Sequence, residues 1–313
     1  MQEIEFKFQV PVKKRKALQK AFTLLKAEPI HLAAQYFDTA DQTLAKHCIA
    51  IRRRQENDEW KQTFKAVDTA KALSRFELEF DIAPPETTTL DLDNYKKDYS
   101  AIYKKLKRAL GLPLPTLELL FETKIQRLRV LQDVGSSTVE IALDIGKIFK
   151  EQSSVDIFEI EFELKQGSIE DLIAFIRPWV QKYQLSLDTH SKSDYGLQAV
   201  RQQSSFSAQY QTPLVLNRSS SEVEALQSIL ANCLQHLLPN ASSIARQQYS
   251  SEHIHQARVA IRRLRSALKS FAAWSDDIQP HWKAELTTIF QALGGTRDID
   301  ALNEDLLPQL IEA

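Results

Sequence analysis

The fold of this chain is most strongly constrained by an alternation of charged and apolar side chains that begins at residue 3. A β-strand over residues 3–8 would place Glu3, Glu5 and Lys7 on one face and apolar side chains on the other. One face of an antiparallel sheet can lie in water, so this segment alone fits either a solvated strand or part of a binding site. The same alternation recurs in at least seven strand segments, and its explanation must therefore cover a whole sheet.

The charged faces of these strands are sorted into acidic and basic groups. The one-sided sets are Glu3, Glu5 and Lys7; Arg52 and Arg54; Lys61 and Lys65; Arg75, Glu77 and Glu79; Arg127; Glu140 and Asp144; and Glu159, Glu161 and Glu163. Solvated strand faces are usually rich in Thr, Ser and Gln, whereas glutamates at every second position of a strand repel one another. The sorting therefore favours faces that bind ligands.

Amphipathic segments at 14–26, 95–110 and 168–183 predict three helices that cover the apolar faces of the strands. With helices outside, the charged faces point inward, and closing the sheet gives a barrel with a polar interior. Divalent cations would neutralise inward carboxylates, and a polyanion would neutralise inward Arg and Lys side chains. The pattern thus predicts a chain of phosphates bound with Mg²⁺ or Mn²⁺, the hard cations that carboxylate oxygens bind. A plain solvated sheet remains the alternative on the pattern alone.

Composition narrows the function classes further. None of the seven glycines falls in a GxGxxG or GxxxxGK arrangement, so side chains rather than a glycine-rich loop would have to hold a phosphate. The net charge of -1 excludes a globally basic nucleic-acid-binding protein. Cys48 and Cys233 are isolated, which suits a reducing compartment. Because no secretory signal or long uncharged apolar run is present, we predict a cytoplasmic protein without a membrane partner.

A polar segment rich in Ser and Gln separates two regions of different periodicity. It extends over 202–219, and beyond it no strand pattern is present. The apolar residues there recur with a helical period over 222–237, weakly over 245–249, and over 255–274, 281–293 and 299–310. The predicted domains are 1–200, a linker over 201–217, and a helical domain over 218–313. The fold class is therefore α+β, with an antiparallel barrel and outer helices followed by an all-α helical bundle.

The first region resembles a known family. Glu3-x-Glu5-x-Lys7 resembles the ExExK signature of the CYTH domain, the triphosphate tunnel metalloenzymes, which include inorganic triphosphatases, thiamine triphosphatases and class IV adenylate cyclases. The supporting matches, in family order, are Tyr36-Phe37-Asp38-Thr39, Arg52-x-Arg54, Thr63-x-Lys65, Arg75-x-Glu77, Arg127, Glu140 with Asp144, Glu159-x-Glu161-x-Glu163, and Ser191-Lys192. The chain departs from the family after Ser191-Lys192, where Asp194-Tyr195 stands in place of a further basic residue.

The resemblance implies an eight-stranded antiparallel tunnel and a role for each matching residue. The implied phosphate ligands are Lys7, Arg52, Arg54, Lys65, Arg75, Arg127 and Lys192. The implied metal ligands are Glu3, Glu5, Glu140, Asp144, Glu159, Glu161 and Glu163, holding two Mg²⁺ or Mn²⁺ ions per site. Glu5, Lys7 and Glu161 are the expected catalytic residues. One metal would orient the triphosphate, and the other would activate a water molecule for attack on a terminal phosphorus.

The helical region resembles a second family. His255, Arg258, Arg262 and Arg265 recur at helical spacing, which alone would fit a solvated basic face. With Leu293-Gly294-x-x-Arg297-Asp298, however, they resemble the CHAD domain, a two-part helical bundle associated with polyphosphate. Residues 218–313 would hold only part of such a module, and the four basic residues are its implied polyphosphate ligands.

These observations rank the possible functions. The leading hypothesis is an inorganic triphosphatase that releases pyrophosphate and phosphate from tripolyphosphate, because the CHAD-like region has no evident use in a cyclase. A thiamine triphosphatase or another organic triphosphatase is the alternative enzyme, and a non-catalytic polyphosphate-binding protein is the alternative without catalysis. A nucleic-acid partner is disfavoured, since the basic helix lacks interleaved aromatic residues.

Overall fold

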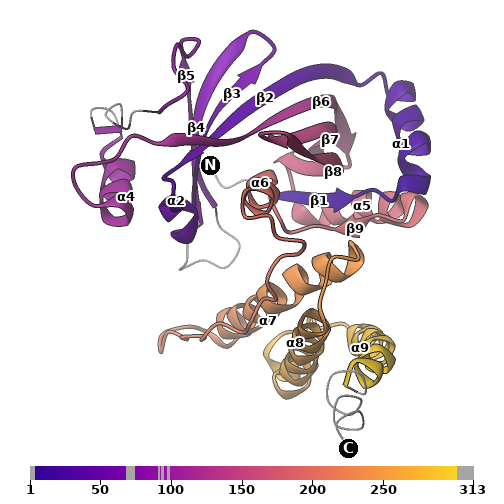
Figure 1. Cartoon of the computed structure of the whole chain (residues 1–313). Helices are drawn as coiled ribbons and strands as arrows, with labels where there is room; N and C mark the ends of the chain where they lie inside the picture. The colour runs from indigo at the N-terminus through magenta and orange to yellow at the C-terminus, as the bar shows by residue number, and fades with distance from the viewer. Residues whose placement is uncertain (1–3, 68–74, 91, 93–94, 97–98, 302–313) are drawn as a thin grey trace, which may run out of the picture. The chain divides into compact units, whose positions relative to one another are not determined.

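The computed structural model describes residues 4–67, 75–90, 92, 95–96 and 99–301 of the chain. The chain divides into two compact units, residues 1–203 and residues 204–313 (Figure 1). The first unit contains the strands together with five of the described helices, and the second is helical.

The first unit is built on one antiparallel sheet of nine strands, in the order β5-β4-β3-β2-β6-β7-β8-β1-β9. The strands are β1 (Glu5–Gln9), β2 (Glu28–Asp38), β3 (Ile49–Glu56), β4 (Glu59–Val67), β5 (Arg75–Ile82), β6 (Glu118–Val134), β7 (Ser137–Lys150), β8 (Ser153–Gln166) and β9 (Ser186–Leu187). The helices of this unit are α1 (Val12–Leu24), α2 (Thr43–Lys46), α4 (Ser100–Leu110), α5 (Ile169–Tyr183) and α6 (Lys192–Val200). The strands at the two ends of the sheet run in clearly different directions, so the sheet is strongly twisted (Figure 1).

The sheet differs from the expected closed barrel of eight strands. The ninth strand, β9, has two residues and pairs with the outer edge of β1. Within the described residues, the strand order is open, with β5 at one end and β9 at the other. A two-residue strand leaves no periodic signal in a sequence, which is why the predicted strand count was wrong. The antiparallel sheet itself and its covering helices are as expected.

Each half of the apolar face is covered by its own helices. Around β1, β7 and β8, side chains such as Phe162 pack with Leu18 of α1 and Leu172 of α5. Around β3 and β4, side chains such as Phe64 pack with Leu106 of α4. All five are completely buried, and burying a side chain of this size stabilises the fold by about 1.5–3 kcal/mol. Helices therefore cover the apolar face of the sheet, and a binding site can lie only on the polar face.

Helix α6 lies against the sheet because of a glycine. A Cβ atom added to Gly196 would stand 2.1 Å from Cε2 of Phe121 on β6, so the helix approaches the strand more closely than a side chain allows. The Phe121 ring in turn stacks on Tyr36 of β2, with centroids 4.5 Å apart. Ser191 and Asp194 form a capping box that starts the helix at Lys192. Asp194, the departure from the family pattern, therefore has a structural role here.

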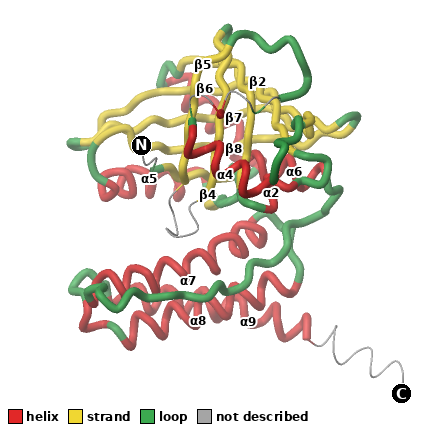
Figure 2. Tube along the Cα trace, turned by 90° about the vertical axis from the view of Figure 1, so that its left-hand side faces the viewer, coloured by secondary structure: helices red, strands yellow, loops and turns green. Residues whose placement is uncertain are grey.

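The second unit contains α7 (Glu222–Ala245), α8 (Ser251–Ser270), a 3₁₀ turn (Ala272–Trp274) and α9 (Pro280–Ala301). The sequence predicted separate segments at 222–237 and 245–249, whereas α7 runs on through Pro239. A proline removes only one helical hydrogen bond, so a long helix can continue through it. The helix expected at 299–310 lies mostly outside the described residues. Helices α7 and α8 lie side by side (Figure 2).

Part of the segment expected to be a linker is hydrogen-bonded to α7. Asn240 receives a hydrogen bond from the backbone N–H of Gln209 at 3.0 Å and donates to the carbonyl of Gln209 at 2.9 Å. Earlier on the same helix, the amide of Asn232 donates to the carbonyl of Thr212 at 3.2 Å. The extended segment runs along the helices of this unit (Figure 2). It thus completes the hydrogen bonding of buried amides on α7.

Replacing Asn240 by alanine should destabilise the second unit by about 1–3 kcal/mol, because Asn240 is fully buried and the backbone groups of Gln209 would lose their partner. The measurement is urea unfolding, with hydrogen exchange of α7 peptides as the unit-specific probe. Asn217→Ala is the matched control, since Asn217 is exposed, and it should change stability by less than about 0.5 kcal/mol. Equal stability of the two variants would contradict this role of Asn240.

Candidate metal and phosphate site

Strand register gathers the acidic residues of the polar face. Lys7 of β1 lies opposite Glu161 of β8, and Asp144 of β7 lies opposite Glu159 of β8. On the other side of β7, Asp144 lies opposite Arg127 of β6. Four adjacent strands therefore bring two cations and three carboxylates together on one face.

The three carboxylates form a compact cluster with two cations inside it. Ligand oxygens of Asp144, Glu159 and Glu161 all lie within 4.8 Å of one another. Lys192 at the start of α6 reaches into the group, with Nζ at 2.8 Å from Asp144, at 2.7 Å from Glu161 and in contact with Glu159. Arg127 donates two hydrogen bonds of 2.7 Å to Asp144 and a further one to Glu161. The side chain of Asp144 is 0% exposed, so these charges are shielded from water.

The charges of this cluster stabilise one another. Burial raises the pKa of the Glu161 carboxyl, but the charges of Lys192 and Arg127 outweigh burial and hold that pKa well below its usual range. Burial likewise lowers the pKa of Lys192, and the carboxylates of Asp144, Glu159 and Glu161 outweigh it and raise the pKa well above its ordinary value. The carboxylate of Glu161 and the ammonium of Lys192 are thus both ionised at neutral pH.

This donor set fits a hard divalent cation. Mg²⁺ and Mn²⁺ are bound through carboxylate oxygens, and Asp144, Glu159 and Glu161 supply such oxygens close together in a shielded site. With Lys7, Arg127 and Lys192 counted, the six groups carry a formal charge of 0, so the cations of the chain itself balance the three carboxylates. These residues therefore fit the metal that the sequence predicted.

The remaining predicted metal ligands lie further along the same face. Glu5 lies opposite Glu163, which lies opposite Glu140 on β7. Lys165 is 2.7 Å from Glu163 and 3.6 Å from Glu140, so these two carboxylates have a cation of their own. Glu3 lies outside the described residues. The structure thus separates the predicted metal ligands into an inner cluster and an outer row.

The predicted phosphate ligands on β3 and β4 form a second charged group. Lys65 is 2.7 Å from Glu77 on β5, and Arg54 is 3.1 Å from Glu79 on the same strand. Arg52 lies 4.0 Å from Glu77. The side chain of Arg75, at the start of β5, lies outside the described part of the chain. The cations are therefore together as expected, and the sequence had not shown that glutamates of β5 would pair with them.

The two charged groups lie within electrostatic reach of each other. Burial lowers the pKa of the Arg54 guanidinium, and the positive charges of Arg52 and Arg127 lower it further. Strand register agrees, because Arg54 lies opposite Ala34 and Arg127 lies opposite Ile30 on the same face of β2. A linear polyanion lying along the face could meet both groups.

Sequence reasoning missed three side chains of this site. Asp188, directly after β9, is buried and lies 4.0 Å from Nζ of Lys7. Tyr36 accepts a hydrogen bond from Arg52 at 3.4 Å, and Thr63 donates one to Glu79 at 3.0 Å. Tyr36 and Thr63 stood within family motifs, but Asp188 carried no signal beyond its place just before Ser191-Lys192.

The four basic residues predicted on α8 have different surroundings. Arg258 lies over the ring of Phe290 on α9 at 4.3 Å from its centroid, and Arg265 lies over the same ring at 5.5 Å. His255 is half-buried, whereas Arg262 is exposed. Two of the four therefore hold α8 against α9.

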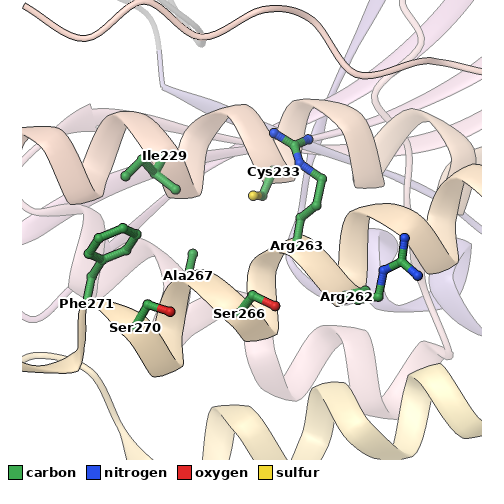
Figure 3. Close-up of a pocket in the computed structure, with 8 residues that line it drawn as sticks. All are labelled: Ile229, Cys233, Arg262, Arg263, Ser266, Ala267, Ser270 and Phe271. Atoms are coloured by element: carbon green, nitrogen blue, oxygen red, sulfur yellow. The ribbon is translucent and has the colours of Figure 1, made fainter.

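Arg262 lines an open groove between α7 and α8 with a volume of about 360 Å³. The other lining residues are Ile229, Cys233, Arg263, Ser266, Ala267, Ser270 and Phe271 (Figure 3). Arg263, which is not one of the four predicted ligands, points to α7 and donates a 2.6 Å hydrogen bond to Asn232. Among the four predicted polyphosphate ligands on α8, Arg262 is therefore the one that lines this groove.

The helices within the described residues include none that is both long and apolar enough to cross a membrane.

Two family comparisons match this chain. The CYTH domain matches residues 1–194, and the CHAD domain matches residues 228–313. These matches confirm both resemblances drawn from the sequence. An inorganic triphosphatase of Haemophilus influenzae is 31% identical over 204 residues, which cover 63% of this chain and 54% of that protein. The chain therefore spans about half the length of this curated relative.

Solved structures are similar at lower identity. A candidate adenylate cyclase of Bacillus halodurans is 20% identical, with 62% of this chain and 96% of that chain covered and a TM-score of 0.43. A Hippeastrum protein described as a candidate adenylyl cyclase with a dominant triphosphatase activity is 17% identical, with 63% and 96% covered and a TM-score of 0.44. The family assignment consequently rests on the sequence matches.

Replacing Lys192 by methionine should destabilise the first unit by about 3 kcal/mol in buffer containing EDTA, because the three buried carboxylates would keep only Arg127 and Lys7 as cationic partners. Urea unfolding measures the loss. Added Mn²⁺ should restore more stability to this variant than to the unmodified protein, since a bound cation stabilises the folded state that binds it.

Lys147→Met is the matched control for this substitution. Lys147 pairs with Asp156 at 3.3 Å, but both side chains are more than half exposed, so the change should cost less than about 1 kcal/mol. If Lys192→Met were as stable as Lys147→Met, the charge balance assigned to the cluster would be wrong.

Proposed function

Because this chain belongs to the CYTH domain family, we propose that its first unit is a metal-dependent triphosphatase that hydrolyses inorganic tripolyphosphate to pyrophosphate and phosphate. The observation that carries the proposal is the buried cluster of Asp144, Glu159 and Glu161, which lies in direct contact with Arg127 and Lys192. Such a site offers oxygens for a metal and cations for phosphate in one place.

The polar face supports a linear polyanion as substrate. Lys7, Arg127 and Lys192 lie at its acidic half, and Arg52, Arg54 and Lys65 lie at the other half. The inorganic substrate is favoured over an organic one by the likeness to a protein named inorganic triphosphatase and by the presence of a CHAD domain. We assign Arg75 to the phosphate ligands and Glu3 to the metal ligands on the sequence match alone.

The residues of the chain divide the work of phosphoryl transfer. Asp144, Glu159 and Glu161 would hold Mg²⁺ or Mn²⁺, with Glu5, Glu140 and Glu163 nearby for a second ion. A bound divalent cation would neutralise phosphate charge and polarise the attacking water. Lys7, Arg127 and Lys192 would orient the phosphates and stabilise the charge of the transition state. Phosphoryl transfer depends mainly on positioning and charge neutralisation, so these groups suffice without a protein nucleophile.

The helical unit supports a role in binding long-chain polyphosphate. Arg262 is exposed at the groove between α7 and α8, and Arg263, Ser266 and Ser270 line the same groove. His255, Arg258 and Arg265 complete the predicted ligand set, although Arg258 and Arg265 also contact Phe290. A polyphosphate-binding unit beside a triphosphatase would raise the local concentration of phosphate chains.

The proposed activity predicts phosphate release from tripolyphosphate with Mg²⁺ or Mn²⁺ and none with EDTA. A panel of tripolyphosphate, ATP, thiamine triphosphate and long-chain polyphosphate ranks the substrates. Glu161→Gln and Glu5→Gln should each lower turnover of tripolyphosphate about a hundredfold or more, because a charged group that binds the metal is lost. Asp156→Asn, an exposed change on the same strand as Glu161, is the control that should retain activity.

The outcomes of the panel separate the alternatives. Preferred hydrolysis of thiamine triphosphate or ATP would replace the inorganic substrate by an organic one, and formation of cyclic AMP would identify a cyclase. An absence of turnover for every compound, with metal present and the protein folded, would contradict the enzyme and leave a phosphate-binding role. Full activity of both Glu→Gln variants would contradict the metal assignment.

For the helical unit, Arg262→Ala in the full chain should weaken the binding of long-chain polyphosphate. The slope of log K (the association constant) against log salt concentration should become shallower by about one, because one cation is removed. Filter binding across a series of salt concentrations measures both quantities. The control is Lys283→Ala, an exposed cation on α9. If both variants bound alike, the groove would not be the polyphosphate site.

A further inference from the structure

Asp188 is a buried carboxylate that neither the sequence match nor the metal cluster accounts for. It follows β9 directly and precedes the capping box of α6, and its side chain is 0% exposed. Its backbone N–H donates to the carbonyl of Lys7 at 2.8 Å, so the segment continues the pairing of β9 with β1. Asp188 thus lies where β1, a short loop and α6 meet.

The two carboxylate oxygens of Asp188 bind different elements. Oδ2 accepts hydrogen bonds from the amide of Gln9 on β1 at 2.5 Å and from the hydroxyl of Tyr195 on α6 at 2.7 Å. Oδ1 accepts one from the backbone N–H of His190 in the loop at 2.9 Å. A single buried group therefore fixes β1, the loop and α6 to one another.

These contacts reach Lys7 by two routes. The ammonium of Lys7 donates a hydrogen bond to the backbone carbonyl of His190. The backbone N–H of His190 in turn donates to Asp188. The same ammonium is 4.0 Å from Oδ2 of Asp188, 5.6 Å from the centroid of the Tyr195 ring and 3.5 Å from Glu159. The carboxylate thus positions the hydrogen-bond acceptor of Lys7 and adds a second negative charge, beside that of Glu159, near the ammonium.

The same residue also fixes the start of α6. Tyr195 lies one turn into the helix from Lys192, and its hydroxyl is anchored on Asp188. Lys192 extends from the first turn of that helix to the three carboxylates of the metal cluster. Fixing the helix at this point determines how far the Lys192 ammonium reaches.

The charge of Asp188 is needed in addition to its shape. Burial raises the pKa of this carboxyl, but hydrogen bonds from His190 and Tyr195 and the charge of Lys7 outweigh burial and hold the pKa well below its usual range. Gln9, the His190 backbone and Tyr195 all act as donors toward the carboxylate. An asparagine at this position would have to direct its own N–H groups at one of those donors.

We propose that Asp188 is a positioning residue of the triphosphatase site, which places Lys7 and Lys192 for contact with the phosphate chain through His190 and Tyr195. This inference rests on the proposed function. The contacts that define this role join Asp188 to a cation and to neutral donors, whereas the metal cluster is formed by Asp144, Glu159 and Glu161. Loss of the Asp188 carboxylate should therefore weaken phosphate binding without weakening metal binding.

The test compares Asp188→Asn with the unmodified protein in three measurements. KM for tripolyphosphate should rise about tenfold or more, because charge-assisted contacts to phosphate are misplaced. Mn²⁺ affinity, measured by electron paramagnetic resonance without substrate, should not fall, because the carboxylates of the metal cluster are unchanged. Tyr195→Phe removes one hydrogen bond and keeps the carboxylate, so its KM should lie between those of the other two proteins. Asp156→Asn is the exposed aspartate control and should match the unmodified protein.

Two results would overturn the inference. One is a folded Asp188→Asn variant with unchanged KM. The other is a fall in Mn²⁺ affinity as large as the fall in tripolyphosphate affinity, which would mean that Asp188 merely supports the whole unit. Failure of the proposed function would be seen separately, as an unmodified protein without turnover. In that case the binding of tripolyphosphate to the same variants is measured by calorimetry. The inference requires that Asp188→Asn bind tripolyphosphate more weakly than the unmodified protein does.

Discussion

Three ionised carboxylates can be buried side by side only if cations are buried with them. Asp144, Glu159 and Glu161 meet this condition through Arg127, which comes from the next strand, and Lys192, which comes from a helix. Removing charges from water costs several kcal/mol per ion, and only close opposite charges and hydrogen bonds offset that cost. The position of α6 is therefore a requirement of the sheet's charge balance, and the close approach of Gly196 to Phe121 and the capping box of α6 meet that requirement.

The polar face is nearly self-neutralised before any ligand arrives. Lys65 and Arg54 pair with Glu77 and Glu79, just as Lys192 pairs with the acidic cluster. A phosphate chain that binds these cations would therefore have to displace the carboxylates that are paired with them. A divalent cation and a polyanion bound together would satisfy both sets of charges at once, whereas either alone leaves one set unbalanced. The proposed triphosphatase would therefore favour a metal complex of the polyphosphate over the free anion.

Strict periodicity made part of this site predictable from the sequence, whereas features that depend on single contacts were missed. The two-residue period placed Glu159 with Glu161 on one face of their strand and Lys7 with Glu5 on one face of another, because a strand allows no other distribution. By contrast, β9 is too short to have a period, and Asp188 acts through a loop that no pattern identifies. The helical period placed Arg258 correctly on α8, but tertiary packing decided that it would lie over the Phe290 ring.

Asp144 and Asp188 show how burial can serve two different purposes on one sheet. Both side chains are fully buried, yet Asp144 is held by the charged groups of Arg127 and Lys192, which are themselves suited to bind phosphate. Contacts of that kind can be exchanged when a ligand of either sign arrives. Asp188 accepts hydrogen bonds from an amide, a hydroxyl and a backbone N–H, none of which has a charge to give to phosphate, and its neighbours Lys7 and the His190 ring lie further away, at 4.0 Å and 3.4 Å. In the proposed triphosphatase, Asp188 would therefore keep Lys7 in place while the cations around Asp144 change partners.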